Sequence, residues 1–189
     1  MQYSKAIKKS DDSSKEFIIQ CLKGDKTYGF DIDSVYVYHD TNDDKYYIFE
    51  YLKCESIKVS PHQSEPKYYP YNWRKFHSLF QLAKKLNGTL ILVNYSDGYR
   101  QEKINGQIQT VELPNKDRYK NEVRLLHVKS INYELLQQYE NLQNKPSHLD
   151  YISYSYDQKL TLEEFSTWLR KINTACGSVK INWELLINE

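Results

Sequence analysis

Apolar and polar positions in the first half of the chain predict a helix, two strands, a second helix and a third strand. Residues 13–24 place apolar side chains at helical spacing between a serine cap and Gly24. Residues 28–39 and 44–56 are rich in β-branched and aromatic residues, and the polar turn DTNDD between them predicts a hairpin. Residues 72–88 have a strong helical period, and residues 89–96 form a continuous apolar run typical of a strand covered on both faces.

The second half of the chain adds strands and helices with the same two periods. Residues 98–113 predict a hairpin that turns at Asn105-Gly106, and residues 122–131 predict a strand. The remaining elements are a helix over 132–143, a strand over 151–160 and a helix over 161–177, at whose start Thr161 and Glu164 fit the S/T-x-x-E capping box. We therefore predict a single α/β domain over residues 1–189, with a mixed β-sheet flanked by helices. Residues 97–189 add C-terminal strands and helices to this domain.

Composition narrows the classes of protein that fit this pattern. The 189 residues carry a net charge of +1, so a nucleic-acid binder would have to rely on a local basic patch. The 3 cysteines lie far apart, which argues against a structural zinc site or a disulfide framework. We expect a cytoplasmic protein without a membrane partner, because no apolar run approaches the roughly 20 residues of a membrane span and no apolar leader is visible.

Glu50 is the candidate for chemistry, because it interrupts the strand DKYYIFEYLKCES at a position expected to be buried. A buried carboxylate is usually neutralised, paired with a basic side chain or bound to a metal ion. The preceding strand supplies a second acidic residue, Asp33 or Asp31. Two carboxylates that share a site favour a cation between them, and their oxygens suit Mg²⁺, Mn²⁺ or Ca²⁺.

The segments FDIDSVYVY, YYIFEYLKCE, NWRKFHSLFQLAKKLNG and TLILVNYS together resemble the core of the PD-(D/E)XK nuclease superfamily. That core runs helix, strand, strand, helix, strand, and the resemblance covers roughly residues 13–96. It implies a restriction-endonuclease-like core in which Asp33 and Glu50 bind Mg²⁺ or Mn²⁺. The same resemblance makes Lys53 the site lysine and Glu16 the acid from the first helix, with Asp31 as the alternative to Asp33.

The spacing of Lys53 departs from the superfamily pattern, in which a single residue separates the Glu from the Lys. Leu52 occupies the usual lysine position here, and on a regular strand Lys53 points to the opposite face. A β-bulge between the two residues would restore the geometry. Lys75 or Gln81 from the following helix are the alternative partners for Glu50. Without a bulge or a partner from the helix, we expect the site either to bind a metal ion without cleaving nucleic acid, or to do neither.

Residues 66–76 mix basic with aromatic residues, a combination that can hold single-stranded nucleic acid. The residues expected to contact phosphates lie on the helix that follows: Arg74, Lys75, Lys84 and Lys85.

The sequence thus predicts a metal-dependent nuclease, with DNA favoured over RNA. The alternative is a catalytically inactive binding module that contacts nucleic acid or a protein partner. In a purely structural interpretation, Glu50 pairs with a basic residue, and Asp31 and Asp33 cap the open end of the hairpin or face solvent.

Overall fold

The computed structural model describes residues 20, 21, 23, 31–39 and 44–177. The chain divides into two compact units, residues 1–31 and residues 32–189, and the second unit carries the strands and helices described below. Glu16 and most of the helix predicted over residues 13–24 lie outside the described residues. The candidate site is therefore built from the second unit alone.

A five-stranded mixed sheet organises this unit, which confirms the predicted mixed α/β class. Its order is β1 (Ser34–His39), β2 (Asp44–Lys53), β3 (Thr89–Tyr95), β6 (Glu122–Ile131) and β7 (Ile152–Thr161). β2 and β3 run parallel, whereas each of the other neighbouring pairs is antiparallel. A parallel pair requires a crossover connection, and α2 (Trp73–Lys85) supplies it.

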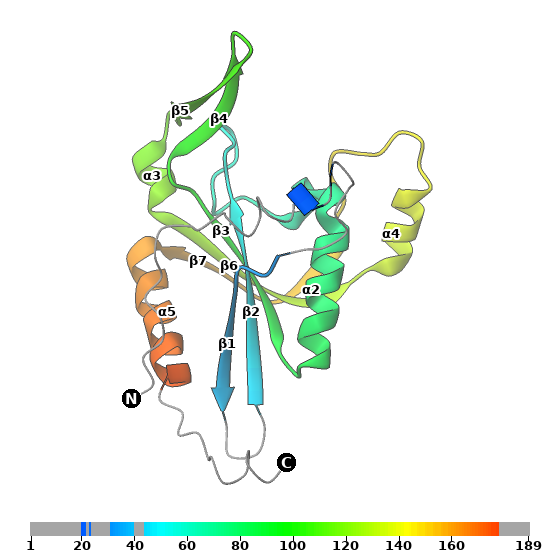
Figure 1. The fold of residues 1–189 in the computed structure, drawn as a ribbon, viewed down its shortest axis with the longest axis vertical. Helices are drawn as coiled ribbons and strands as arrows, with labels where there is room; N and C mark the ends of the chain where they lie inside the picture. The colour runs from blue at the N-terminus through cyan, green and yellow to red at the C-terminus, as the bar shows by residue number, and fades with distance from the viewer. Residues whose placement is uncertain (1–19, 22, 24–30, 40–43, 178–189) are drawn as a thin grey trace. The chain divides into compact units, whose positions relative to one another are not determined.

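Helices cover both faces of the sheet, so two apolar layers form (Figure 1). α2 packs Phe76, Leu79 and Ala83 against one face, where the side chains of Ile48 and Leu92 lie. On the opposite face, Phe165 and Trp168 of α5 (Leu162–Gly177) join an apolar cluster with residues of the sheet: Phe49, Ile91, Val93 and Leu125. This double covering explains why residues 89–96 read as a continuous apolar run rather than an alternating one.

Gly88 connects α2 to β3 at a point of close backbone approach. A Cβ atom at this position would lie 2.3 Å from the carbonyl oxygen of Tyr46 on β2. The absence of a side chain therefore lets the chain leave the helix and enter the sheet directly beside β2.

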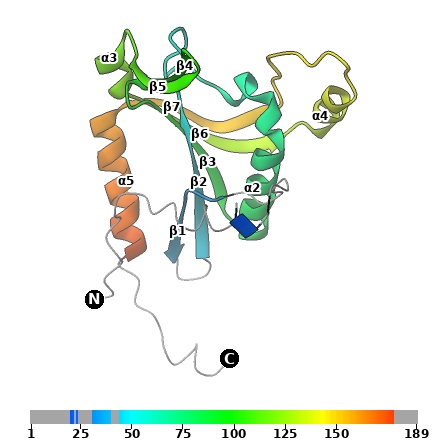
Figure 2. The same cartoon turned by 45° about the horizontal axis from the view of Figure 1, so that its top comes forward.

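Smaller elements surround the sheet. β4 (Tyr99–Ile104) and β5 (Gln107–Glu112) form a separate hairpin that projects from the sheet, as the two views agree (Figures 1 and 2). Asn105 and Gly106 turn this hairpin with φ of 52° and 83°, the conformation that the Asn-Gly pair predicts. The remaining short elements are η1 (Pro66–Tyr68), η2 (Pro70–Asn72), α3 (Lys116–Lys120) and α4 (Tyr133–Glu140). Within the described part of the chain, no helix is long and apolar enough to span a membrane.

Candidate functional site

The candidate site lies at the carboxyl end of β2, where the strand extends past its antiparallel neighbour. The pairing of β1 with β2 begins at Ser34 opposite Phe49, whereas β2 continues alongside β3 as far as Lys53 opposite Tyr95. Residues 50–53 therefore pair with β3 on one side and extend past the first residue of β1, Ser34, on the other. Carboxyl ends of parallel strands are common ligand sites in open α/β sheets, because the chain turns away there and leaves a crevice.

Glu50 is buried, and its carboxylate meets the first turn of α2. Its side chain shares the face of Ile48 and Leu92, which α2 covers. The Nζ atom of Lys75 lies 2.7 Å from Glu50 Oε1, and the Lys75 side chain is 27% exposed. The packing of the neighbouring Phe76 into the core sets the position of Lys75 at the edge of this layer. The buried acid thus has the basic partner that its burial requires, and the helix supplies it.

Asp33 lies just before β1 and extends the ladder of β2. Its Oδ2 atom accepts a hydrogen bond of 2.6 Å from the backbone N–H of Tyr51, the residue that follows Glu50. The Asp33 side chain takes the place of the carbonyl that a longer β1 would present, and the residue stays exposed. This is the capping role expected in the structural interpretation of Asp33, and it also brings the carboxylate beside the backbone of Glu50. Asp31 belongs to the other unit of the chain.

Lys53 lies on the opposite face of β2 and is engaged elsewhere. Between Tyr47 and Lys53 the register with β3 advances one residue at a time, so this stretch has no bulge that would turn Lys53 toward Glu50. Lys53 Nζ instead lies 2.9 Å from Glu55 Oε1 and 3.0 Å from Asp97 Oδ2. Burial lowers the pKa of Lys53, but these two carboxylates outweigh that effect and leave it raised, so the side chain stays charged at neutral pH.

Gln81, the other residue proposed to replace the lysine, has its partner on α4. Its Nε2 atom donates a hydrogen bond of 2.8 Å to the Tyr133 hydroxyl on α4. Of the two alternatives that the sequence left open, Lys75 is the one with a contact to Glu50.

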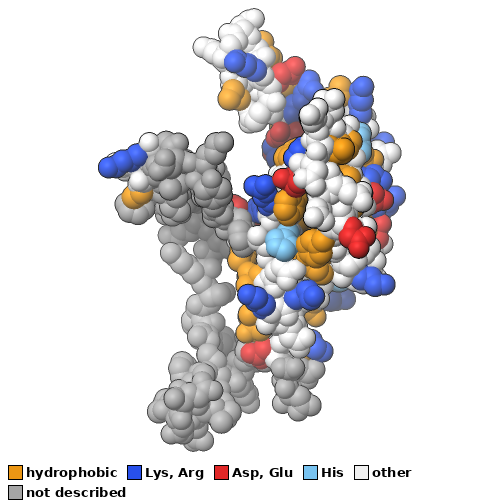
Figure 3. Space-filling view, turned by 90° about the vertical axis from the view of Figure 1, so that its right-hand side faces the viewer, with side chains coloured by type: hydrophobic (Ala, Val, Ile, Leu, Met, Phe, Trp, Pro, Cys, Tyr) orange, Lys and Arg blue, Asp and Glu red, His pale blue; other side chains and the backbone are white. Residues whose placement is uncertain are grey.

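The basic residues of α2 do not form one patch. Arg74 is 71% exposed and lies 3.1 Å from Glu140 on α4, while Lys84 and Lys85 are exposed in the last turn. The ten-residue separation of Arg74 and Lys84 corresponds to about 15 Å along the helix axis. Figure 3, which faces the side of α2 and α4, shows Lys and Arg side chains scattered among other types. Phosphate contacts by the full set would require a ligand that runs the length of α2.

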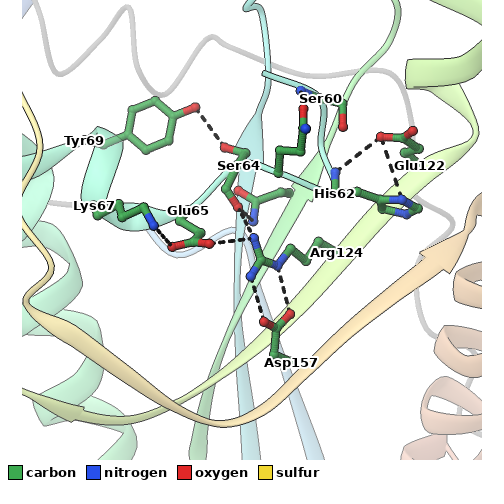
Figure 4. Close-up of polar contacts among 11 residues, drawn as sticks. Ser60, His62, Ser64, Glu65, Lys67, Tyr69, Glu122, Arg124 and Asp157 are labelled. Atoms are coloured by element: carbon green, nitrogen blue, oxygen red, sulfur yellow. Dashed lines mark hydrogen bonds and ion pairs between the residues drawn. The ribbon is translucent and has the colours of Figure 1, made fainter. Parts of the chain in front are cut away.

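A charged cluster that the sequence analysis missed lies on the same sheet face, around the buried Arg124 of β6. The Arg124 guanidinium donates to both carboxylate oxygens of Asp157, at 2.8 and 2.7 Å, and to Glu65 Oε1 and the Ser64 carbonyl, each at 3.1 Å (Figure 4). Hydrogen bonding to Arg124 lowers the pKa of Asp157. Burial raises the pKa of Glu65, but hydrogen bonds from Lys67 and Arg124 offset this and lower it overall. A single arginine inside the apolar run EVRLLHV was the available signal.

These contacts hold the segment before α2 against the sheet. Arg124 holds Ser64 and Glu65, and Glu122 of the same strand accepts a hydrogen bond of 3.4 Å from the His62 backbone N–H. The Ser64 hydroxyl lies 3.2 Å from the Tyr69 hydroxyl, which extends the network toward η2 (Figure 4). The consequence is that residues 66–72, the tyrosine-rich segment before α2, have a defined position beside the end of β2.

A pocket of about 410 Å³ opens between this segment and the end of β2. Residues of β2 and of the tyrosine-rich segment line it, among them Tyr51, Leu52, Lys53, Tyr69, Tyr71 and Asn72. Leu52 lies two residues beyond Glu50, or about 7 Å along a strand. Asn72 lies three residues before Lys75, or about 5 Å along a helix. The pocket is therefore adjacent to the Glu50–Lys75 pair.

Asp33 and Glu50 carry carboxylate oxygens, the donor type that hard divalent ions prefer, and Glu50 already has the Lys75 ammonium beside it. Mg²⁺ commonly keeps several waters and is held by one or two carboxylates together with substrate phosphates, and Asp33 and Glu50 supply that donor type. Within the described residues, no group of three or more His, Cys, Asp or Glu side chains is arranged to hold a metal ion. Any ion at this site would therefore depend on two carboxylates, water and substrate.

Comparisons with known proteins add no independent assignment. No protein-family model, curated protein or solved structure matches the chain. The resemblance to the PD-(D/E)XK superfamily thus stays a prediction from the sequence, and the functional argument rests on the geometry at the end of β2.

Proposed function

We propose that the protein is a metal-dependent phosphodiesterase acting on nucleic acid, with Asp33 and Glu50 as ligands of one Mg²⁺ or Mn²⁺ ion. Lys75 takes the role that the superfamily pattern gives to Lys53. The observation that carries this proposal is the 2.7 Å contact between Lys75 Nζ and the buried Glu50 carboxylate at the carboxyl end of a parallel strand. It supplies an acid and a lysine together despite the non-standard spacing on β2.

Each residue would have a distinct role in this chemistry. A bound divalent ion would lower the pKa of water and stabilise charge on the phosphate. Glu50 orients the Lys75 ammonium, which is positioned to donate a hydrogen bond to an attacking water or to a phosphate oxygen. The hydrogen bond from the Tyr51 backbone N–H fixes one oxygen of Asp33 and so orients the carboxylate.

Cleavage assays test the proposal directly. Purified protein is incubated with labelled single- and double-stranded DNA and RNA, in Mg²⁺ or Mn²⁺ and in excess chelator. We expect cleavage that requires the ion, and a loss of about 10²-fold or more in Lys75→Met, the usual range for losing one hydrogen-bond donor that stabilises the transition state. Lys129→Met, which removes an exposed lysine of β6, is the matched control and should keep its activity.

Two results would refute the assignment. One is wild-type protein that cleaves none of the four substrates with either ion. The other is full activity in Glu50→Gln. A loss of activity in Lys53→Met with full activity in Lys75→Met would restore the original role of Lys53 and overturn that of Lys75.

A second candidate function is a binding module that keeps the site but does not cut. Two observations favour it: Lys53 is held by Glu55 and Asp97, and the Lys75 ammonium already compensates the buried Glu50. Such a protein would bind nucleic acid equally well with and without chelator and would leave it intact. Binding that increases with Mg²⁺ would argue against this alternative.

A further inference from the structure

An exposed aromatic ring stands at the mouth of the pocket beside the candidate site. Tyr71 is 70% exposed and lines the pocket together with Tyr69 and Asn72. It lies in η2, where Pro70 restricts the backbone directly before α2. The ring is thus presented from a rigid turn rather than from a long loop.

The other walls of the pocket are also aromatic and well supported. Tyr51 stacks on Phe49 at 6.1 Å between ring centroids and meets Tyr95 edge-on at 6.3 Å. Tyr69 is held by its hydroxyl contact of 3.2 Å with Ser64. Burial raises the pKa of both Tyr51 and Tyr69, so their hydroxyls stay neutral at neutral pH. Neutral aromatic surfaces of this kind favour a planar π-system as the occupant.

Polar groups at the rim match the edges of a nucleobase. Asn72 has both a donor and an acceptor on its amide, and the ion pair of Lys53 with Glu55, 2.9 Å apart, also lines the pocket. The volume of about 410 Å³ lies within the usual range of roughly 300–1,000 Å³ for small-molecule sites. A single nucleobase with its sugar is an occupant of the appropriate size and chemistry.

The position of the pocket relates it to the phosphate that the proposed site would cleave. Strand and helix geometry place its walls about 5–7 Å from the Glu50–Lys75 pair. That separation is about two base steps of a nucleic-acid strand at 3.4 Å each. A base of a regular duplex cannot enter such a pocket, because it is stacked and paired inside the helix.

We infer that the pocket between η2 and the end of β2 receives an unpaired base within about two nucleotides of the cleaved phosphate, with Tyr71 as its stacking platform. The substrate class would then be single-stranded nucleic acid, or a junction or flap that presents an unpaired nucleotide. This inference rests on the proposed function for the position of the base relative to the cleaved phosphate. The pocket itself makes a binding prediction that does not require cleavage.

Equilibrium binding under non-cleaving conditions tests the inference. Fluorescence anisotropy with chelator present measures the affinity of the wild type for a labelled 12-nucleotide single strand, for its duplex, and for an abasic strand of the same length. We expect the single strand to bind more tightly than the other two probes. Tyr71→Ala should lose about 5- to 100-fold on the single strand, the range for one base–aromatic stack, and should match the wild type on the abasic strand.

Two variants serve as controls in the same assay. Tyr71→Trp keeps an aromatic platform and should retain the wild-type affinity. Tyr156→Ala removes a partly exposed ring (44%) from β7, which lies at the far edge of the sheet, and should change nothing. Equal affinities of the wild type and Tyr71→Ala for the single strand would overturn the inference. So would wild-type binding of the abasic strand as tightly as of the normal one.

The test separates this inference from the proposed function. Tyr71-dependent binding without any cleavage refutes the phosphodiesterase but supports the base pocket. Ion-dependent cleavage with single-strand binding unaffected by Tyr71→Ala supports the phosphodiesterase and refutes the pocket.

Discussion

Replacing Lys75 with methionine tests the central contact of the candidate site. The substitution keeps much of the side-chain volume but removes the ammonium that lies 2.7 Å from the buried Glu50 carboxylate. Arg74→Met, at the neighbouring position, removes the same charge from a side chain that is 71% exposed and paired with Glu140 on α4. The two variants differ mainly in the burial of the ion pair that each one loses.

The structure sets the size of the expected difference. Removing one partner of a buried ion pair costs about 3–5 kcal/mol, because the remaining charge stays away from water. Partial exposure of Lys75 moderates this cost, so we expect the unfolding free energy to fall by about 3 kcal/mol. The exposed pair of Arg74 is worth about 0–1 kcal/mol. With a urea slope of about 2 kcal/mol per molar, Lys75→Met lowers the unfolding midpoint by about 1.5 M.

Urea unfolding followed by circular dichroism at pH 7 measures both variants. The double variant Glu50→Leu/Lys75→Met should recover most of the loss, because an apolar pair of similar volume replaces the ionic one. The reasoning fails if Lys75→Met and Arg74→Met unfold within about 0.5 kcal/mol of each other, the usual spread for surface substitutions. It also fails if the double variant is less stable than Lys75→Met.

Three further predictions concern the scaffold of the site. Gly88→Ala should lower the unfolding free energy by about 1–3 kcal/mol, since its Cβ would lie 2.3 Å from the Tyr46 carbonyl; an unchanged thermal midpoint would contradict this. The pKa of Glu65 is lowered from its ordinary value of 4.5 in the folded protein, so the Glu65 carboxylate stabilises the fold. Its contribution to the unfolding free energy is complete above pH 4.5 and is lost as the pH falls through the lowered pKa. Glu65→Gln should therefore flatten the acid side of the stability curve, and parallel curves would exclude the effect. Thr161→Ala removes the cap of α5, in which the Thr161 hydroxyl accepts from the Glu164 N–H at 3.2 Å, and should cost about 0.5–2 kcal/mol in urea titrations.

Much of the local structure could be predicted because it follows from short-range rules. The helix predicted over 72–88 appears as Trp73–Lys85, and the hairpin predicted to turn at Asn105-Gly106 does so. The capping box at Thr161 opens α5 as its spacing indicates. Each of these features depends on side-chain period, on left-handed backbone conformations or on caps within a few residues of one another.

The candidate site was predicted only as a set of alternatives, because its contacts join distant segments. The alternation of side chains along β2 indicated that Lys53 points away from Glu50, and the regular register with β3 agrees. It left open whether Lys75 or Gln81 approaches Glu50, since that depends on how α2 is rotated against the sheet. The cluster around Arg124 was missed because Glu65 and Asp157 lie 59 and 33 residues away from it.

The sequence by itself therefore determined the strands of the sheet, the longer helices among the described residues and the burial of Glu50, since side-chain period and hydrophobicity act locally along the chain. The direction of Lys53 depended on whether β2 carries a bulge, which the regular register with β3 decided. Only the tertiary structure decided that β3 lies beside β2, that Lys75 meets Glu50, and that Asp33 accepts from the backbone of Tyr51. The physical reason is that the order of the strands and the rotation of α2 against the sheet depend on the packing of the whole apolar core. Charged partners far apart in the sequence come together only once that core has formed.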